Sequence, residues 1–163
     1  MDYAVKPLVR EDGEAVLDIF NHYVENSFAA YPESRLPYQA FEAFLAMCKG
    51  YPSGSVTDRS GKVVGFGMLR AFHPAPVFLQ TAELTCFLHP DHTGKGIGRM
   101  LLYVLERGGR EMGVRNLLAG ISSRNPGSIR FHEKNGFSEC GRVKNAGRKH
   151  GLDFDVVWMQ KVL

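Results

Sequence analysis

A glycine-rich stretch near the middle of the chain has the composition of an anion-binding turn. It alternates glycines with larger residues, includes two cations, and consists of Gly94, Lys95, Gly96, Ile97, Gly98 and Arg99. The apolar run 82–88 before it is typical of a buried strand, and 96–112 repeats apolar residues at helical spacing. A turn between a strand and a helix presents unpaired backbone N–H groups and the positive end of the helix dipole. The stretch therefore predicts a phosphate site, and its glycines allow close approach of the ligand.

Three nucleotide-binding patterns compete for this stretch. The P-loop pattern requires glycine at position 89 and a hydroxyl after Lys95, whereas the chain has His89 and Gly96 there. The dinucleotide pattern requires a third glycine where the chain has Arg99 or Leu101. The pyrophosphate turn for coenzyme A fits 93–98 at every position except the first. A turn without a ligand is the plain alternative, but three glycines there would weaken the helix without compensation.

The composition predicts one globular domain over residues 1–163. Hydrophobic residues make up 44% and charged residues 23%, an ordinary mixture. The net charge of +3 suits one polyanionic small molecule, and without a basic stripe we expect no nucleic-acid partner. No apolar run is long enough for a membrane span, and the start does not resemble a signal peptide. The cysteines Cys48, Cys86 and Cys140 fit neither a disulfide framework nor a metal site, so we expect a cytoplasmic protein without metal.

The segments on either side of the turn alternate between strand and helix patterns, which indicates an α/β domain. Strands are expected at 3–9, 55–58, 63–72, 82–88, 117–121, 138–144 and 154–161. Helices are expected at 12–25, from Pro37 to just before Gly50, at 96–112 and at 126–134. The basic stretch 142–150 is expected to be a solvated or substrate-facing loop.

Five segments, spread over nearly the whole chain, contain motifs that occur together in one family. They are 19–24, 65–83, 89–98, 122–137 and 147–160. The fourth contains an Asn-x-x-Ser pattern from Asn125 and a His-Glu-x-x-Gly-Phe pattern from His132. Together the segments resemble the GNAT superfamily of N-acetyltransferases, and within it the phosphinothricin and methionine sulfone or sulfoximine acetyltransferases.

This resemblance implies a fold, a donor and an assembly. The fold would be a mixed α/β (α+β) domain whose mainly antiparallel sheet has a V-shaped split between its central strands. Acetyl-CoA would place its pyrophosphate on 94–99 and its pantetheine arm in the split, paired with backbone groups of Cys86, Phe87 and Leu88. The protein would be a homodimer and would transfer acetyl to a small-molecule amine directly, in a ternary complex.

Glu83 is the candidate general base. An ammonium has no lone pair, and its pKa is near ~10, so an amine must lose a proton before it attacks a thioester. Glu83 is the one carboxylate in the strand before the turn, and it matches the glutamate of the phosphinothricin-type pattern. The alternative is a strand glutamate that faces solvent or pairs with an arginine. Backbone N–H groups near Phe87 and Leu88 are the candidates to stabilise the oxyanion.

For His132 and Asn125 the resemblance suggests a role in the reaction or in binding the donor, but the sequence also allows a purely structural role for each. His132 occupies the position of the tyrosine found in most of the superfamily, as in the phosphinothricin group. It would protonate the leaving thiolate or orient the donor, or it is structural. Asn125 would bond the pantetheine arm, or it caps the helix that begins at Pro126.

The acceptor side departs from the group's pattern. Thr93 replaces an arginine or glutamine, with its backbone N–H still expected to face the phosphates, and Phe78 and Asp153 replace a tyrosine and a tryptophan. Phe28, Phe72 and Phe78, with Tyr31, are expected to line an apolar acceptor pocket, unless they are core aromatics. The acceptor would be a small amino-acid-like amine. The alternatives are a protein N-terminus or lysine, or a non-catalytic module that binds coenzyme A.

Overall fold

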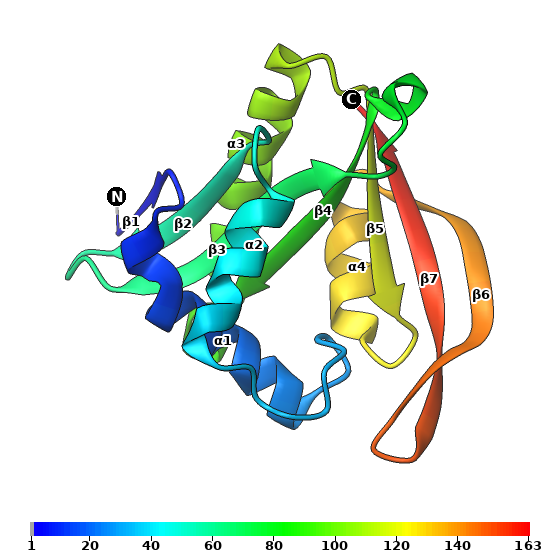
Figure 1. The fold of residues 1–163 in the computed structure, drawn as a ribbon, viewed down its shortest axis with the longest axis horizontal. Helices are drawn as coiled ribbons and strands as arrows, with labels where there is room; N and C mark the ends of the chain where they lie inside the picture. The colour runs from blue at the N-terminus through cyan, green and yellow to red at the C-terminus, as the bar shows by residue number, and fades with distance from the viewer. Residues whose placement is uncertain (1) are drawn as a thin grey trace.

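The chain folds into a seven-stranded sheet with helices on both faces (Figure 1). A computed structural model describes residues 2–163. The strands are β1 (Tyr3–Lys6), β2 (Ser53–Asp58), β3 (Val63–Ala71), β4 (Thr81–Leu88), β5 (Asn116–Ser122), β6 (Ser138–Lys149) and β7 (Leu152–Val162). The helices are α1 (Gly13–Asn26), α2 (Phe41–Met47), α3 (Ile97–Glu111) and α4 (Pro126–Lys134). The mixed α/β class predicted from the sequence is confirmed, with strand order β1-β2-β3-β4-β5-β7-β6.

The two central strands of the sheet, β4 and β5, separate along their length. They pair in parallel only where Thr81–Glu83 faces Asn116–Leu118, whereas every other neighbouring pair is antiparallel. Beyond Glu83, β4 continues its ladder with β3 alone, and beyond Leu118, β5 continues with β7 alone. The mainly antiparallel sheet with a split at its centre, expected from the family resemblance, is therefore present.

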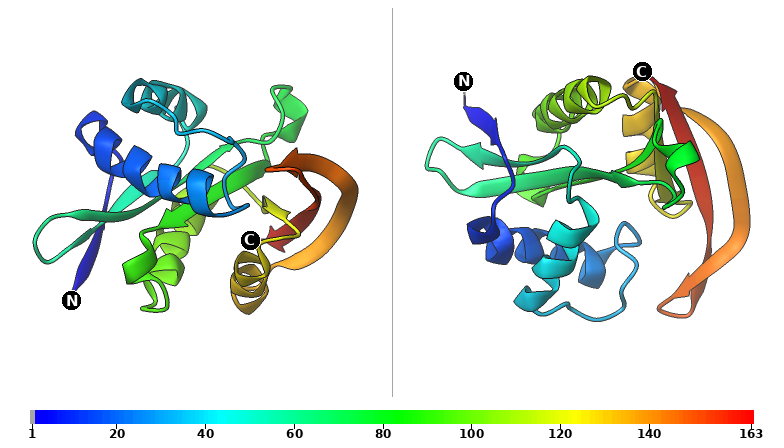
Figure 2. Two further views of the ribbon diagram at one scale, coloured as in Figure 1. Left: turned by 90° about the horizontal axis from the view of Figure 1, so that it is seen from below. Right: turned by 45° about the horizontal axis from the view of Figure 1, so that its top comes forward.

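Helices α1 and α2 cover one face of the sheet and α3 and α4 cover the other (Figure 2). Alternate side chains of a strand point to opposite faces of the sheet, so β3 contributes side chains to the hydrophobic cores on both faces. Phe66 and Met68 pack with α1 and α2, while Leu69 packs with α3. None of the helices within residues 2–163 has the length and apolar composition that a membrane crossing needs.

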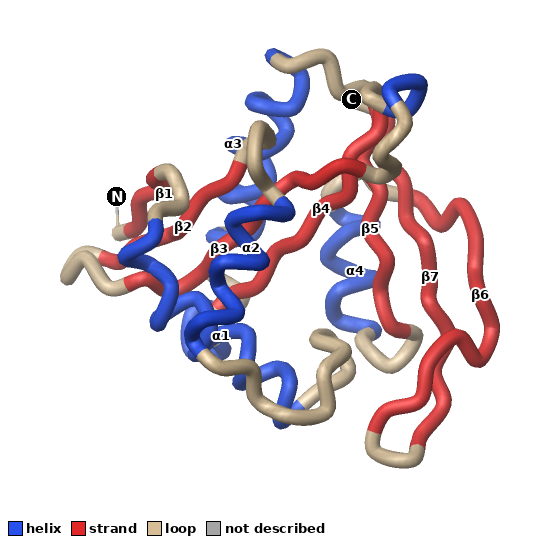
Figure 3. Tube along the Cα trace, in the orientation of Figure 1, coloured by secondary structure: helices blue, strands red, loops and turns tan. Residues whose placement is uncertain are grey.

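The predicted helices and strands are present, most of them with shifted ends, and the prediction for 142–150 is wrong. The expected loop at 142–150 is mostly strand, because β6 continues to Lys149 alongside β7 (Figure 3). A register shift between Val143 and Gly147 interrupts the ladder, which explains why the strand pattern in the sequence fades there. Lys149, which belongs to the stretch expected to be a solvated or substrate-facing loop, is only 1% exposed.

Candidate active site

The turn before α3 has the backbone geometry of an anion site. Gly94 and Gly96 have φ angles of 72° and 79°, a region that L side chains rarely adopt, and an added Cβ at either would meet no atom within 4 Å. The first bond of the helix runs from the Met100 N–H to the Gly96 carbonyl, and no side chain caps the helix. The N–H groups at 97–99 therefore have no partner within the helix and are available to an anion.

Three other residues of the turn have roles that differ from one another. Gly98 gives α3 room beside α4, because its added Cβ would lie 3.0 Å from the Phe131 ring. The Lys95 ammonium group donates to the Asp91 carbonyl at 2.8 Å, within its own turn. The Thr93 N–H was expected to face the phosphates, but it donates to the Pro90 carbonyl at 3.3 Å. Thr93 therefore shapes the turn and contributes no N–H of its own to the site.

The edge of β4 that faces the split offers backbone groups from alternate residues. Antiparallel strands alternate between pairs that exchange backbone hydrogen bonds and pairs that do not. The His89 N–H donates to the Val64 carbonyl at 2.8 Å, so His89 and Val64 form a hydrogen-bonded pair. The next pair, Leu88 and Gly65, therefore exchanges no backbone hydrogen bonds. The backbone groups of Leu88 and Cys86 therefore point into the split. Those of Phe87 point toward β3, which corrects the expectation that all three residues serve the ligand.

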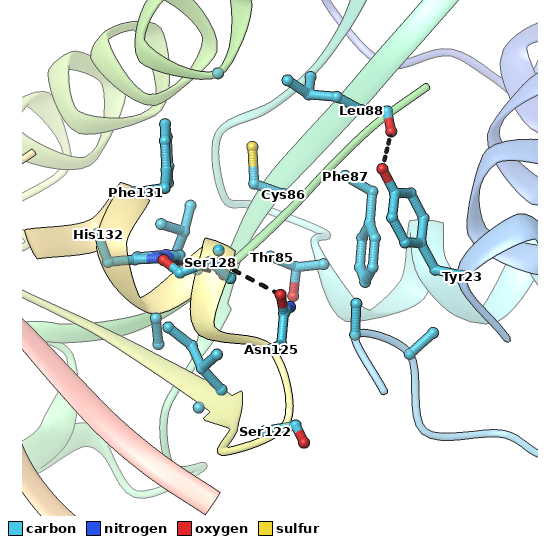
Figure 4. A pocket seen from close by; sticks show the side chains of 18 of the residues that line it. Tyr23, Thr85, Cys86, Phe87, Leu88, Ser122, Asn125, Ser128, Phe131 and His132 are labelled. Carbon is cyan, nitrogen blue, oxygen red and sulfur yellow. Dashed lines mark hydrogen bonds between the residues drawn. The ribbon is translucent and has the colours of Figure 1, made fainter. Parts of the chain in front are cut away.

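The Leu88 carbonyl, one of these backbone groups, already has a hydrogen-bond partner within the protein. The Tyr23 hydroxyl donates to the Leu88 carbonyl at 2.5 Å, as Figure 4 shows. Burial raises the pKa of Tyr23, so its hydroxyl keeps the proton it donates. The Leu88 N–H and both backbone groups of Cys86 remain available along the split.

A cavity of about 1000 Å³ joins the turn to the split. Its lining includes ten residues predicted from the sequence to bind or react: Glu83, Cys86, Phe87, Leu88, Gly94, Gly96, Gly98, Arg99, Asn125 and His132. At the other end it is lined by Ala29–Pro32, a segment between α1 and α2 that has no regular structure. One continuous cavity therefore connects the anion site, the edge of β4 and the segment 29–32. We call the part of it lined by Ala29–Pro32, Arg70 and Glu83 the chamber.

Five residues predicted for the site lie outside the lining of this cavity. They are Lys95, Ile97, Phe28, Phe72 and Phe78. Ile97 is in the core, Phe28 packs edge-on against Phe154, and Phe72 packs against Phe78 in the connection between β3 and β4. Of the four aromatic residues expected at the acceptor pocket, Tyr31 is the one that lines the cavity, and its ring stacks on Phe154 at 5.5 Å.

Glu83 pairs with an arginine, as the alternative interpretation of the sequence held without naming the partner, and that partner is Arg70. Arg70 lies opposite it in the β3–β4 ladder and donates to its carboxylate at 2.6 Å, and to the Thr85 hydroxyl at 2.5 Å. Both charged groups line the cavity. A signal existed in the sequence, since Arg70 is the one cation in the predicted strand 63–72. The carboxylate is therefore fixed in direction and lines the cavity.

His132 is buried in its neutral form. The side chain is 6% exposed, and its Nδ1 lies 2.7 Å from the Ser128 carbonyl, so Nδ1 carries the proton and donates it. Burial lowers the pKa of His132, although the hydrogen bond to Ser128 opposes that effect. The neutral ring presents an Nε2 lone pair, so it can accept a hydrogen bond but is poorly suited to deliver a proton at neutral pH.

Asn125 and Cys86 complete the middle of the cavity. The Asn125 side-chain oxygen accepts from the Ser128 N–H at 3.3 Å, which makes it the cap of α4, as the alternative interpretation held (Figure 4). Its amide group has no acceptor among residues 2–163 and can still donate to a ligand. Burial raises the pKa of Cys86 to about 12, so its thiol is not a nucleophile. Within residues 2–163 no three His, Cys, Asp or Glu side chains gather to hold a metal ion.

The arrangement of turn, split and chamber defines a class of protein. Residues 16–137, well over half of the chain, match the model of the acetyltransferase (GNAT) family, and the chain belongs to this family. It is an acyltransferase that uses acetyl-CoA as its donor, and the residues at the turn and the split fit that ligand.

Three proteins of known or named activity are similar to this chain over most of their length. The L-methionine sulfoximine/L-methionine sulfone acetyltransferase of Salmonella typhimurium is 32% identical over 93% of this chain and 89% of its own. A phosphinothricin acetyltransferase from Sinorhizobium meliloti, solved in complex with acetyl-CoA, has a TM-score of 0.93 and 30% identity over all of this chain and 89% of its own. A ribosomal-protein-alanine N-acetyltransferase from Brucella melitensis has a TM-score of 0.90 and 34% identity, over 98% and 99%.

Proposed function

We propose that the chain, as a single domain, transfers the acetyl group of acetyl-CoA to the amino group of a small amino-acid-like compound. The observation that carries this proposal is the continuous cavity, which leads from the turn at Gly94 to the paired charges of Arg70 and Glu83. An α-amino acid has both a cation and an anion, so it complements a pair of opposite charges at a chamber wall. Methionine sulfone, methionine sulfoximine and phosphinothricin, named in the relatives, have this form.

The proposed reaction divides the site into three parts. The N–H groups at 97–99 hold the pyrophosphate, while Asn125 and the backbone of Cys86 bind the pantetheine arm. Glu83 takes a proton from the amine, directly or through water, and the nitrogen attacks the thioester carbonyl. The Leu88 N–H, which points into the split, stabilises the oxyanion. The C–N bond forms, the C–S bond breaks, and the coenzyme leaves as a thiolate without obligatory help, since thiols have pKa values near ~8.5. The thiolate then takes up the second proton that the attacking nitrogen loses, so the products are the amide and free thiol.

His132 is proposed as a contact of the donor rather than as an acid. Its Nδ1–H is committed to the Ser128 carbonyl, so the atom free to meet a ligand is Nε2. As an acceptor, Nε2 suits a thiol or an amide N–H of the pantetheine arm.

Release of free thiol from acetyl-CoA tests the proposed function. The panel compares L-methionine sulfone, L-methionine sulfoximine and phosphinothricin with polyamines and short peptides. We expect thiol release to depend on the amine and to be greatest with the amino-acid analogues. Release without regard to the amine, or with none of the small compounds, would contradict the proposal.

Glu83→Gln tests the base. We expect kcat to fall by roughly 100- to 10,000-fold, the usual contribution of general acid–base catalysis, while the Kd for acetyl-CoA stays unchanged. The exchange of Glu139 for Gln on the exposed strand β6 is the control for loss of a carboxylate. Full turnover at neutral pH by a Glu83→Gln protein that binds acetyl-CoA normally would remove Glu83 from the mechanism.

A second candidate acceptor is a protein N-terminus. The similarity to the ribosomal-protein-alanine N-acetyltransferase of Brucella melitensis favours it. A peptide that begins with alanine, included in the same panel, separates the two candidates. A kcat/KM for that peptide above those of all the amino-acid analogues would favour the protein acceptor.

We also propose that the protein forms a homodimer and is located in the cytoplasm. A homodimer rests on the family resemblance, and light scattering after size exclusion would show twice the chain's 18.2 kDa. A cytoplasmic location is consistent with three free cysteines, and cell fractionation tests it.

A further inference from the structure

Lys149 is buried and does not line the cavity, yet its ammonium group makes three hydrogen bonds. It donates to the carbonyls of Val24, Ser27 and Ala30 at 2.8, 2.7 and 2.6 Å. A lysine ammonium has three N–H donors and no acceptor, so all of its hydrogen-bonding capacity goes to these carbonyls. Val24 lies in the last turn of α1, where carbonyls lack helical partners and a cation is favoured.

The carbonyls belong to the segment that forms one wall of the acceptor chamber. We call residues 27–36 the roof segment. Its residues Ala29–Pro32 line the cavity, although none of the segment is helix or strand. At its far end the Asn21 side chain bonds both backbone groups of Leu36, at 2.8 and 2.9 Å. The roof segment is therefore held at its far end by α1 and at its near end by Lys149.

The β6–β7 hairpin supports the roof segment at two further points. The His150 N–H donates to the Glu33 carboxylate at 2.6 Å, and the Phe154 ring lies beneath Tyr31 with the rings 13° from parallel. Gly147 makes room for that ring, since an added Cβ would lie 2.3 Å from it. The end of the hairpin lies next to the roof segment in Figure 3, whereas the donor turn is carried by β4 and α3.

We propose that Lys149 is a positioning residue which fixes the roof segment, so that the β6–β7 hairpin controls binding of the amine separately from binding of acetyl-CoA. The proposal rests on the proposed function, because it assigns the chamber to the amine. Without the ammonium group, the buried carbonyls of Val24 and Ala30 and the partly buried carbonyl of Ser27 lose their donor, and the wall of the chamber loses its fixed position. In a protein that lacks this ammonium group, the glycine turn before α3, which binds the donor acetyl-CoA, should keep the contacts described above, and so should the edge of β4.

The test compares Lys149→Met with Lys161→Met, using L-methionine sulfone as the amine. Lys161 pairs with the buried Glu106, so its loss should lower the melting temperature without changing the chamber. For Lys149→Met we expect the KM for the amine to rise at least tenfold while kcat and the Kd for acetyl-CoA change less than threefold. For Lys161→Met we expect the KM to change less than twofold.

Two results would overturn the proposal: an unchanged amine KM in folded Lys149→Met, or an acetyl-CoA Kd that rises by the same factor as the KM. If Lys149→Met does not fold, Phe154→Leu removes the support under Tyr31 and should produce the same separation of KM from Kd. An unchanged KM in Phe154→Leu would then reject the proposal. If wild-type protein releases no thiol with any amine, the proposed function fails first, and the two failures are thus distinguishable.

Discussion

At the scale of single residues, the site depends on charges and protons held in fixed places. Arg70 fixes the direction of the Glu83 carboxylate, and the Ser128 carbonyl fixes the tautomer of His132. Both residues line the cavity. Because burial lowers the pKa of His132, its neutral ring offers a hydrogen-bond acceptor more readily than a proton.

His132 should make the stability of the protein depend on pH. Its pKa is lower in the folded state than the usual ~6.5, so the unfolded chain binds more protons below that pH. The stabilisation is complete above about pH 6.5 and decreases as the pH falls toward the folded-state pKa. In urea unfolding at pH 7.5, 6.0 and 5.0, His132→Asn should lose less stability on acidification than the wild type does.

The matched control for this measurement is His22→Asn, since His22 is exposed on α1. It should keep the wild-type decrease in stability. An equal decrease in His132→Asn and wild type would show that burial of His132 does not produce the pH dependence.

At the scale of elements, the turn between β4 and α3 binds anions because its backbone adopts an unusual conformation. Gly94→Ala should raise the Kd for acetyl-CoA by at least tenfold, because an alanine at a φ of 72° costs roughly 1–2 kcal/mol and shifts the turn. Gly61→Ala is the matched control, since Gly61 has a φ of 83° in the β2–β3 turn and equally open surroundings.

Calorimetric titration with acetyl-CoA and thermal unfolding separate the two effects. Both variants should lose similar stability, and only Gly94→Ala should lose affinity. Equal affinity in the two variants would mean that the conformation of Gly94 does not matter for the donor.

The sequence predicted elements well where the signal was local. The helix at 126–134 was predicted with both ends correct, because Asn125 and Pro126 begin it and Asn135-Gly136 ends it. The glycine turn was predicted for the same reason. Lys149 was missed because its partners are 119 to 125 residues away in the chain, and no local pattern reports such a contact.

The acceptor chamber was the part least predictable from the sequence. Residue type suggests Phe28 and Phe72, and the family resemblance suggests Phe78. Which loop residues reach the cavity, however, depends on how the roof segment and the β3–β4 connection cross the sheet. The Arg70–Glu83 pair required the exact register of β3 against β4. The split itself came from the family resemblance, since no periodicity in the sequence indicates where two strands separate.

At the scale of the whole molecule, the donor should stabilise the fold. A ligand that binds only the folded state adds RT ln(1 + [L]/Kd), or about 2.7 kcal/mol at a hundredfold excess over Kd. The melting temperature should therefore rise by several degrees with acetyl-CoA, and by less in Gly94→Ala at the same concentration. Adenosine without the phosphates is the control ligand. An equal rise with adenosine would show that the turn does not supply the affinity.

Along β4, backbone groups point alternately toward the split and toward β3, and this alternation limits which amino acids each position can accept. Positions 86 and 88 meet the split through their main chain, so their side chains are free to change as long as they still pack beneath α3. Proline is the exception at both positions, since it has no N–H to offer. At position 87 the side chain is the constrained part, because the ring of Phe87 packs against Phe66 while its N–H bonds to β3. Divergent copies of this chain should therefore exchange Cys86 and Leu88 for other apolar residues more freely than Phe87.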